Sequence, residues 1–154
     1  MSYLTSNQLK QYEDEGYVSP INIFSNEKAK EIRNEIELIE KIMPEELEKS
    51  GRYNAHLISP LLDEVTHNSK ILDAVESLIG KNILVCGTTL FIKNPYEKGF
   101  VSYHQDAKYI GLEPHNWVTA WVAITDSNLK NGCMRMWSGS HKDNLKDHDQ
   151  MFNE

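Results

Sequence analysis

Residues 103–109 (YHQDAKY) hold a histidine and an aspartate two positions apart, His104 and Asp106. Side chains at positions i and i+2 of a β-strand point to the same face of a sheet. An extended segment here would therefore place an imidazole nitrogen beside a carboxylate oxygen, which are two of the three ligands of the 2-His-1-carboxylate triad of non-haem Fe(II) sites. The spacing makes His104 and Asp106 candidate metal ligands, although His-x-Asp alone is a weak pattern.

A second His-x-Asp triplet, HKD at residues 141–143, tests how much the spacing means. It follows the turn-forming sequence SGS and precedes the charged segment 144–149. Such surroundings are typical of a solvated surface. We therefore expect residues 141–143 to lie on the surface without a metal role, whereas His104 lies in a stretch with strand character.

The first half of the chain is predicted to be helical. Apolar residues from Ala29 to Met43 recur in alternating steps of three and four, which is the period of one buried helix face. Residues 60–79 carry enough regularly spaced apolar residues for a second helical pair. Capping and stop signals mark the ends of these elements. They are Thr5 with Gln8 in capping-box spacing, Gly16, Ser25, Pro44 and Gly80.

After residue 80 the composition changes to β-branched and aromatic residues, which favour strands. Residues 116–126 alternate between two faces, as a half-buried strand does. Helices followed by strands predict an α+β fold, with N-terminal helices packed on one side of an antiparallel sheet or barrel. No linker divides the chain, so residues 1–154 are expected to form a single domain. The segments with strand character are 82–95, 100–109, 116–126 and 133–142.

The composition argues against several classes of protein. The formal net charge is −7 at pH 7 and no basic stripe occurs, so nucleic acid is not an expected partner. No stretch approaches the roughly 18 uncharged apolar residues of a membrane span, and the N-terminus lacks the features of a secretory signal. Cys86 and Cys133 lie far apart, which indicates buried thiols in a reducing compartment rather than a disulfide framework. A cytoplasmic location is expected.

Four motifs follow one another in the second half of the chain: HQD at 104–106, Trp121 in TAWVAI, KNG at 130–132 and GSHK at 139–142. The sequence LTSNQLKQYEDEGYV stands near the N-terminus. The order of the four motifs resembles the phytanoyl-CoA dioxygenase family, whose members are Fe(II)- and 2-oxoglutarate-dependent oxygenases, and the N-terminal sequence resembles the family's first helix and the Gly-Tyr strand after it. The resemblance covers nearly the whole chain and is far more specific than His-x-Asp alone.

The resemblance implies a double-stranded β-helix, which is a jelly-roll or cupin-like barrel. In that fold residues 1–80 are mainly helical and residues 81–142 supply barrel strands. His141, in the GSHK motif, is implied to lie in a loop after a barrel strand and not to bind the metal. The last barrel strands are missing, so the resemblance is C-terminally incomplete.

The resemblance also implies a function for the candidate pair. His104 and Asp106 are implied to bind Fe(II), and the expected reaction is hydroxylation of a small organic substrate with 2-oxoglutarate as cosubstrate. Ascorbate is an optional further cofactor. A carboxylate at position 106 favours hydroxylation, because halogenating relatives carry a small residue there. The residues implied to neighbour the cosubstrate are Gln105, Trp121 and Lys93.

The family's second histidine ligand and the arginine that pairs with 2-oxoglutarate are expected well after GSHK. The only histidine after residue 142 is His148, in a charged segment, and no arginine follows Arg135. Two interpretations stay open: the N-terminal part of a longer enzyme, or a shortened, non-catalytic relative that binds a ligand or partner. A third is a cupin-like module for a different metal, in which His148 or another residue completes the site. The substrate and the oligomeric state are left open.

Overall fold

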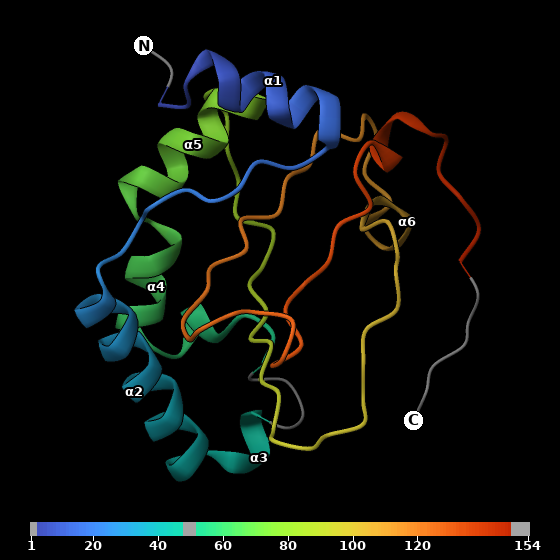
Figure 1. The fold of residues 1–154 in the computed structure, drawn as a ribbon. Coiled ribbons are helices and arrows are strands. Elements are labelled where there is room, and N and C mark those ends of the chain that lie inside the picture. The colour runs from blue at the N-terminus through green and yellow to red at the C-terminus, as the bar shows by residue number, and fades with distance from the viewer. Residues whose placement is uncertain (1–2, 48–51, 149–154) are drawn as a thin grey trace.

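The computed structural model describes residues 3–47 and 52–148. Helices form nearly all of its regular structure, and most of them lie in the first half of the chain (Figure 1). The elements in chain order are α1 (Ser6–Glu15), α2 (Asn26–Ile42), α3 (Pro44–Glu46), the 3-10 helix η2 (Ala55–Leu57), α4 (Pro60–Thr66), α5 (Ser69–Ile79), α6 (Ala107–Ile110) and the 3-10 helix η3 (Ser140–Lys142).

Local capping determines where α1 and α2 begin and where α1 ends, as predicted. The Thr5 hydroxyl accepts a hydrogen bond from the N–H of Gln8, and the Gln8 side chain accepts one from the N–H of Thr5, which completes the capping box. Gly16 adopts a left-handed conformation with φ of +84° and ends α1. The Ser25 hydroxyl accepts a hydrogen bond from the N–H of Lys28 at 3.2 Å and begins α2.

The predicted second helical pair is confirmed as α4 and α5. Ser59 caps α4, where its hydroxyl accepts a hydrogen bond from the N–H of Leu62 at 3.4 Å. Asn68 separates the two helices, because its side chain accepts hydrogen bonds from N–H groups in the first turn of α5. Gly80 ends α5 with φ of +87° and donates its N–H to the carbonyl of Glu76 at 2.9 Å.

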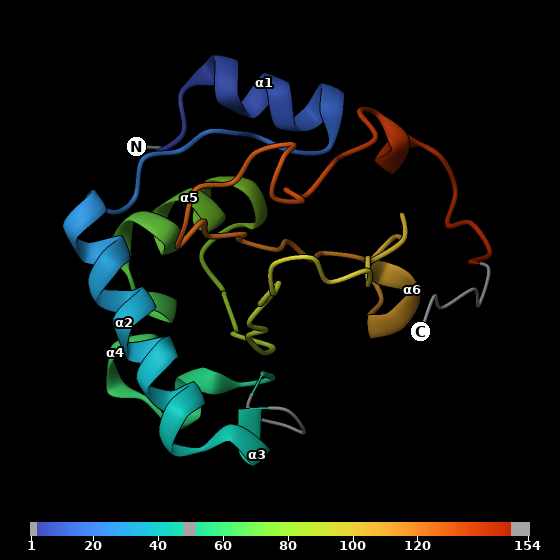
Figure 2. The ribbon, with the colours of Figure 1, turned by 60° about the horizontal axis from the view of Figure 1, so that its bottom comes forward.

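Helices α2, α4 and α5 lie along one side of the molecule, α1 lies across its top, irregular chain runs through the middle, and α6 lies on the side opposite α2 and α4 (Figures 1 and 2). The hydrophobic core forms where α2 and α4 meet this irregular chain. A hydrogen bond of 2.7 Å from the Ser59 hydroxyl to Oε1 of Glu35 links the two helices beside the core. The buried core residues are Ile32, Ile39, Leu47, Ala55 and Leu62, and Leu90, Ile92 and Ile124 are among the partly buried side chains packed on them.

The predicted α+β fold, with helices packed on a double-stranded β-helix, is wrong for the described residues 3–47 and 52–148. In them, β-pairing is limited to one isolated antiparallel bridge between Tyr53 and Thr89, and residues 81–142 form irregular chain and turns with two short helical elements. The physical reason is that β-branched and aromatic residues favour extended backbone, but a strand is stable only when a neighbouring strand pairs with it. The sequence pattern identified residues suited to strands and did not specify their partners.

Two smaller predictions in the second half of the chain concern the Asn-Gly turn and the two cysteines. The Asn-Gly turn at 131–132 is confirmed, because the N–H of Cys133 donates a hydrogen bond of 3.1 Å across it to the carbonyl of Asn128. The prediction of buried thiols is wrong for Cys86, which is exposed, while Cys133 is partly buried.

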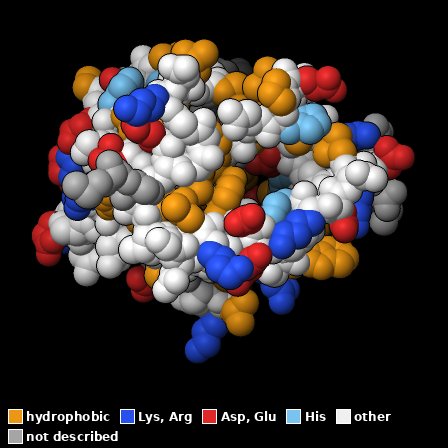
Figure 3. Space-filling model, turned by 90° about the horizontal axis from the view of Figure 1, so that it is seen from above, with side chains coloured by type: hydrophobic (Ala, Val, Ile, Leu, Met, Phe, Trp, Pro, Cys, Tyr) orange, Lys and Arg blue, Asp and Glu red, His pale blue; other side chains and the backbone are white. Residues whose placement is uncertain are grey.

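Large apolar side chains remain exposed in the second half of the chain. Leu84 is 94% exposed, Phe91 65% and Trp137 70%. The face shown in Figure 3 is hollowed near its middle, and hydrophobic side chains are visible in the hollow. Because the described chain forms no sheet here, it offers no second layer that could cover these side chains.

Candidate functional site

His104 and Asp106 lie where the chain enters α6. Asp106 has helical φ and ψ values of −54° and −36°, and the N–H of Tyr109 donates a hydrogen bond of 2.9 Å to its carbonyl. The prediction of a strand over residues 100–109 is therefore wrong. A turn into a short helix, and not the alternation of a strand, brings the two side chains together.

The facing atoms of the pair are Nε2 of His104 and Oδ1 of Asp106, which lie 3.1 Å apart. The two side chains are 32% and 44% exposed, so an ion in solution can reach them. Two ligand atoms about 2.1 Å from one divalent ion, at a right angle, lie about 3 Å from each other. The separation suits neighbouring coordination positions, and it equally suits an ion pair when His104 is protonated.

Each member of the pair is held by a second contact on its far side. Nδ1 of His104 lies 2.8 Å from the carbonyl oxygen of Ser102, and the Thr119 hydroxyl donates a hydrogen bond of 2.9 Å to Oδ2 of Asp106. A carbonyl oxygen only accepts, so Nδ1 carries the proton and Nε2 faces Asp106. Metal-binding histidines and carboxylates are usually oriented by contacts of this kind.

A segment near the C-terminal end of the described chain, residues 146–148, also reaches the pair. The N–H of Gln105 donates a hydrogen bond of 3.1 Å to Nε2 of His148, and the N–H of Lys146 donates one of 2.8 Å to Oε1 of Gln105. Sequence reasoning placed residues 146–148 outside the family's site, except in the cupin-like alternative. No spacing rule could have linked them to residues 104–106, because the contacts span more than 40 positions.

Aromatic rings pack around the place where residues 146–148 contact the segment that carries His104 and Asp106. The Tyr109 ring centroid lies 5.8 Å from that of His104 and 5.4 Å from that of His148. Tyr103 and Trp137 form an edge-to-face pair with centroids 6.5 Å apart. These distances are typical of packing contacts between rings.

The side chains of His104 and Asp106 match part of an iron site. In the described parts of the chain, no group of three or more His, Cys, Asp or Glu side chains is arranged to hold a metal. His148 does not complete the pair in this arrangement, because its Nε2 already accepts the N–H of Gln105. His104 and Asp106 thus fit two positions of a 2-His-1-carboxylate triad, and a third ligand would have to come from elsewhere.

The three residues predicted to neighbour a cosubstrate have different surroundings. The Gln105 side chain accepts the N–H of Lys146, Trp121 is 41% exposed, and Lys93 donates a hydrogen bond of 2.7 Å to the carbonyl of Gly132. Within the described residues, no hydrogen bond, ion pair or ring contact joins Trp121 or Lys93 to the metal-ligand candidates. Their roles stay predictions.

The second His-x-Asp triplet has a different environment. Nε2 of His141 lies 3.0 Å from the carbonyl oxygen of Glu13, at the C-terminal end of α1. Asp143 forms an ion pair of 2.7 Å with Lys146 and makes no contact with His141. The triplet therefore joins η3 to α1, and its histidine and carboxylate are directed to different partners.

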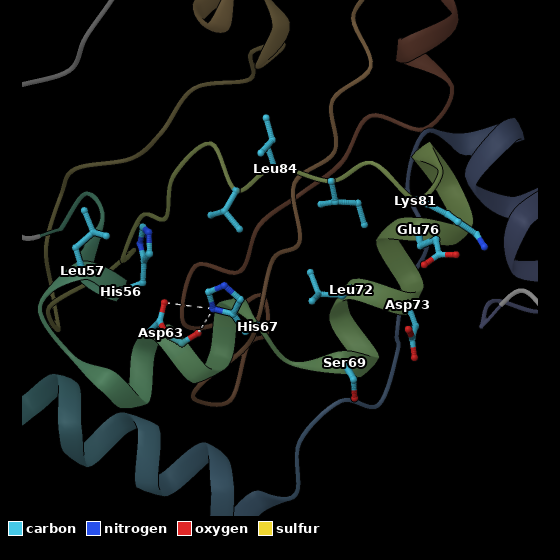
Figure 4. Close-up of a pocket in the computed structure, with 12 residues that line it drawn as sticks. His56, Leu57, Asp63, His67, Ser69, Leu72, Asp73, Glu76, Lys81 and Leu84 are labelled. Atoms are coloured by element: carbon cyan, nitrogen blue, oxygen red, sulfur yellow. Dashed lines mark hydrogen bonds and ion pairs between the residues drawn. The ribbon is translucent and has the colours of Figure 1, made fainter.

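A separate cleft of about 720 Å³ lies between α4, α5 and residues 81–85 (Figure 4). Among its lining residues, His67 pairs with Asp63 at 3.3 Å, and Nδ1 of His56 lies 2.9 Å from the Thr88 hydroxyl. None of the five predicted site residues lines this cleft. The cleft is thus distinct from the His104–Asp106 pair.

Comparison with known proteins identifies the class. The phytanoyl-CoA dioxygenase (PhyH) family matches residues 12–154. The chain belongs to this family, which is one of Fe(II)- and 2-oxoglutarate-dependent oxygenases.

Curated relatives agree with this assignment. The chain is 33% identical to a phytanoyl-CoA dioxygenase of Arabidopsis thaliana over 90 residues, which cover 58% of this chain and 32% of the relative. It is 33% identical over 109 residues to phytanoyl-CoA dioxygenase domain-containing protein 1 of Danio rerio, covering 69% and 37%, and 39% identical over 88 residues to that of Rattus norvegicus, covering 56% and 30%. The matches span about a third of the length of these relatives. No solved structure matches the chain.

Within the described residues, every helix is too short or too polar to cross a lipid bilayer.

Proposed function

We propose that this chain forms part of an Fe(II)- and 2-oxoglutarate-dependent dioxygenase that hydroxylates a small organic substrate. The observation that carries the proposal is the His104–Asp106 pair, whose facing atoms lie 3.1 Å apart while their other polar atoms are engaged. Membership of the phytanoyl-CoA dioxygenase family supports the same chemistry.

The number of protons that the His104 imidazole needs to contact Asp106 supports a metal role for the pair. Nδ1 of His104 donates to the carbonyl of Ser102, so Nε2 can hydrogen-bond to Asp106 only when the imidazole carries a second proton. A divalent cation between Nε2 and Oδ1 would take the place of that proton and leave the contacts of Ser102 and Thr119 intact. Metal binding to such a site releases a proton.

Iron would activate dioxygen, the oxidant of the hydroxylation, with 2-oxoglutarate as the cosubstrate that is oxidised to succinate and CO2; protein side chains lack this chemistry. His104 and Asp106 would hold the iron, and the partly exposed setting of the pair leaves room for cosubstrate. Gln105, Trp121 and Lys93 are proposed to neighbour the cosubstrate, with ascorbate as an optional cofactor. Lys93 is a cation, and attraction to a carboxylate would require it to exchange its contact with Gly132.

In the proposed longer enzyme, the remaining groups of such a site would come from residues outside 1–154, because all six histidines of this sequence lie in its described parts. They are a second histidine ligand and a cation for the distal carboxylate of 2-oxoglutarate.

We also propose a single domain over residues 1–154 and a cytoplasmic location, the latter because the cysteines form no disulfide framework in the described chain. The net charge of −7 supports a small-molecule substrate over nucleic acid.

One observation favours a second candidate, a non-catalytic relative that binds a ligand or partner. The described residues hold no group of three metal-binding side chains. Two protein ligands would bind a divalent cation more weakly than three and would leave it less firmly oriented.

The test is a titration of the full chain with Co(II), followed by its visible absorption, and an anaerobic titration with Fe(II) and 2-oxoglutarate. His104→Ala and Asp106→Ala should each weaken metal binding by about tenfold or more, since each removes a direct ligand. His141→Ala is the matched control, because His141 belongs to the same kind of triplet and contacts α1 instead. The control should bind metal as the unchanged chain does.

Succinate formed from 2-oxoglutarate in air separates the two candidates. Metal binding that depends on His104 together with succinate production supports the dioxygenase. Metal binding without succinate supports the non-catalytic relative. A chain that binds no Co(II), or binds it equally well without His104, rules out the metal site.

A further inference from the structure

Three polar contacts fasten residues 146–148 to the segment that carries the candidate ligands. Two are hydrogen bonds to Gln105, which stands between His104 and Asp106 in the chain. The third is an ion pair of 3.0 Å between Lys108 and Asp147. The attachment therefore acts on the residue between the two ligands and on the first turn of α6.

Gln105 donates one of these hydrogen bonds and accepts the other. Its backbone N–H donates to the imidazole of His148, and its side-chain oxygen accepts the backbone N–H of Lys146. Backbone and side chain of one residue are thus held at once, which restricts both the peptide unit and the direction of the side chain. Restricting Gln105 also restricts where the neighbouring Cα atoms can place the imidazole of His104 and the carboxylate of Asp106.

The chemistry of His148 fits the role of an acceptor. Nε2 takes a hydrogen bond from a backbone N–H, so in the neutral ring the proton resides on Nδ1. Nδ1 is buried and has no hydrogen-bond partner in the part of the chain that the structure describes. The ring is therefore fixed through Nε2 alone and by its packing against Tyr109 at 5.4 Å.

We infer that His148 is a positioning residue for the metal-ligand pair: through its hydrogen bond from the N–H of Gln105 it holds His104 and Asp106 at the spacing that a divalent cation requires. The inference rests on the proposed function, because it assumes that the pair binds a metal. It assigns His148 a role other than that of a third ligand, since Nε2 accepts the hydrogen bond and the other ring nitrogen, Nδ1, is buried.

Three substitutions in the full chain separate this role from a general effect on folding. His148→Gln keeps an acceptor at the position of Nε2, His148→Asn moves it to the position of Nδ1, and His148→Ala removes it. His115→Ala is the control, because His115 contacts only the carbonyl of Leu112 within its own loop. Circular dichroism of each variant verifies that the helices are retained.

The first measurement is amide hydrogen exchange at Gln105, which needs no metal. Exchange should be about fivefold faster in His148→Ala and His148→Asn, the factor that one net hydrogen bond corresponds to, and near that of the unchanged chain in His148→Gln. The second is Co(II) affinity and the intensity of its visible absorption. Affinity should fall about tenfold in the Ala and Asn variants and be largely restored in the Gln variant, as for other outer contacts of metal ligands.

The outcomes distinguish failure of the proposed metal site from failure of the positioning role of His148. If the unchanged chain binds no Co(II), the proposed function fails, and the exchange rates still report whether His148 holds Gln105. If the chain binds Co(II) but His148→Ala binds it within twofold of the unchanged chain, the positioning role is overturned and the metal site stands. Equal behaviour of the Gln and Asn variants would also overturn it, because the assignment depends on which ring nitrogen accepts. Loss of binding in His115→Ala would show that the effect is not specific to His148.

Discussion

The hydroxyl of Thr119 donates a hydrogen bond of 2.9 Å to Oδ2 of Asp106, across 13 positions of sequence. This contact directs the other carboxylate oxygen, Oδ1, toward His104. A carboxylate held at one oxygen loses rotational freedom about its last bond, so less entropy is lost when the free oxygen binds an ion. Thr119 therefore supports the candidate site without any ligand role of its own.

Thr119→Val keeps the shape of the side chain and removes the donor. Co(II) affinity of the chain should fall by about tenfold, the lower end of the range for outer contacts of metal ligands. Thr119→Ser restores the donor and should restore affinity. Thr125→Val is the control, since the Thr125 hydroxyl contacts only the carbonyl of Asp126. Unchanged affinity in Thr119→Val would mean that the contact does not orient the carboxylate.

The parts of this structure that could be predicted from sequence are those that depend on neighbours within a few residues. The capping box of Thr5 and Gln8 and the stop at Gly80 act over three or four positions, and the structure contains them as predicted. Apolar periodicity likewise identified the face of α2 that buries Ile32 and Ile39. Each signal is complete within its own helix.

The parts that could not be predicted depend on pairing between distant segments. The pattern of a strand does not specify which segment pairs with it. The described residues 81–142 form one β-bridge, at Thr89. The contact between Gln105 and His148 joins positions 43 apart, and no motif in the sequence links them. The juxtaposition of His104 and Asp106 was expected from strand geometry, yet a turn into α6 produces it.

Burial on α2 should determine the cost of removing an aliphatic side chain. Ile32 is 1% exposed in the core, and Leu38 on the same helix is 51% exposed. Ile32→Ala should lower the free energy of unfolding by about 2–5 kcal/mol, through lost burial and the cavity left behind. Leu38→Ala should change it by no more than about 0.5 kcal/mol. Urea unfolding followed by circular dichroism compares them, and equal losses would contradict the placement of the core.

Gly16 and Gly80 both adopt positive φ values, +84° and +87°, but they differ in what a new Cβ would meet. An alanine at Gly16, in the left-handed αL conformation, costs about 1–2 kcal/mol for the backbone, and one at Gly80, where ψ is −178°, costs about 1–3 kcal/mol. At Gly16 the new Cβ would also lie 2.5 Å from Nδ1 of His141, whereas at Gly80 it meets no atom within 4 Å. Urea unfolding of Gly16→Ala should therefore show a loss of stability beyond the backbone cost, whereas Gly80→Ala should show the backbone cost alone.

A double-mutant cycle isolates the contribution of His141 to the loss in Gly16→Ala. If the clash with His141 causes the extra cost, Gly16→Ala should cost less in a chain that already carries His141→Ala. The coupling free energy should then account for most of the loss beyond the backbone cost. Strict additivity of Gly16→Ala and His141→Ala would exclude the clash as the cause.

The ion pair between Lys108 and Asp147 should be visible in the titration of the carboxyl. The hydrogen bond from Lys108 holds the pKa of Asp147 below its ordinary value of 3.8. Because the pKa is lower in the folded chain than in the unfolded chain, the contact stabilises the fold above the unfolded value. That stabilisation is lost as the pH falls through the lowered pKa. Lys108→Gln should therefore raise the pKa of Asp147 toward 3.8, as followed by NMR of the carboxyl carbon.

The same titration tests whether residues 146–148 are attached through Lys108 in solution. Lys130→Gln, in the turn at 128–132, is the control and should leave the pKa of Asp147 unchanged. A carboxyl that titrates at its ordinary value in the unchanged chain would mean that Asp147 does not pair with Lys108. The hydrogen bonds of Gln105 would then be the only polar attachment of this segment to the candidate ligands among the described residues.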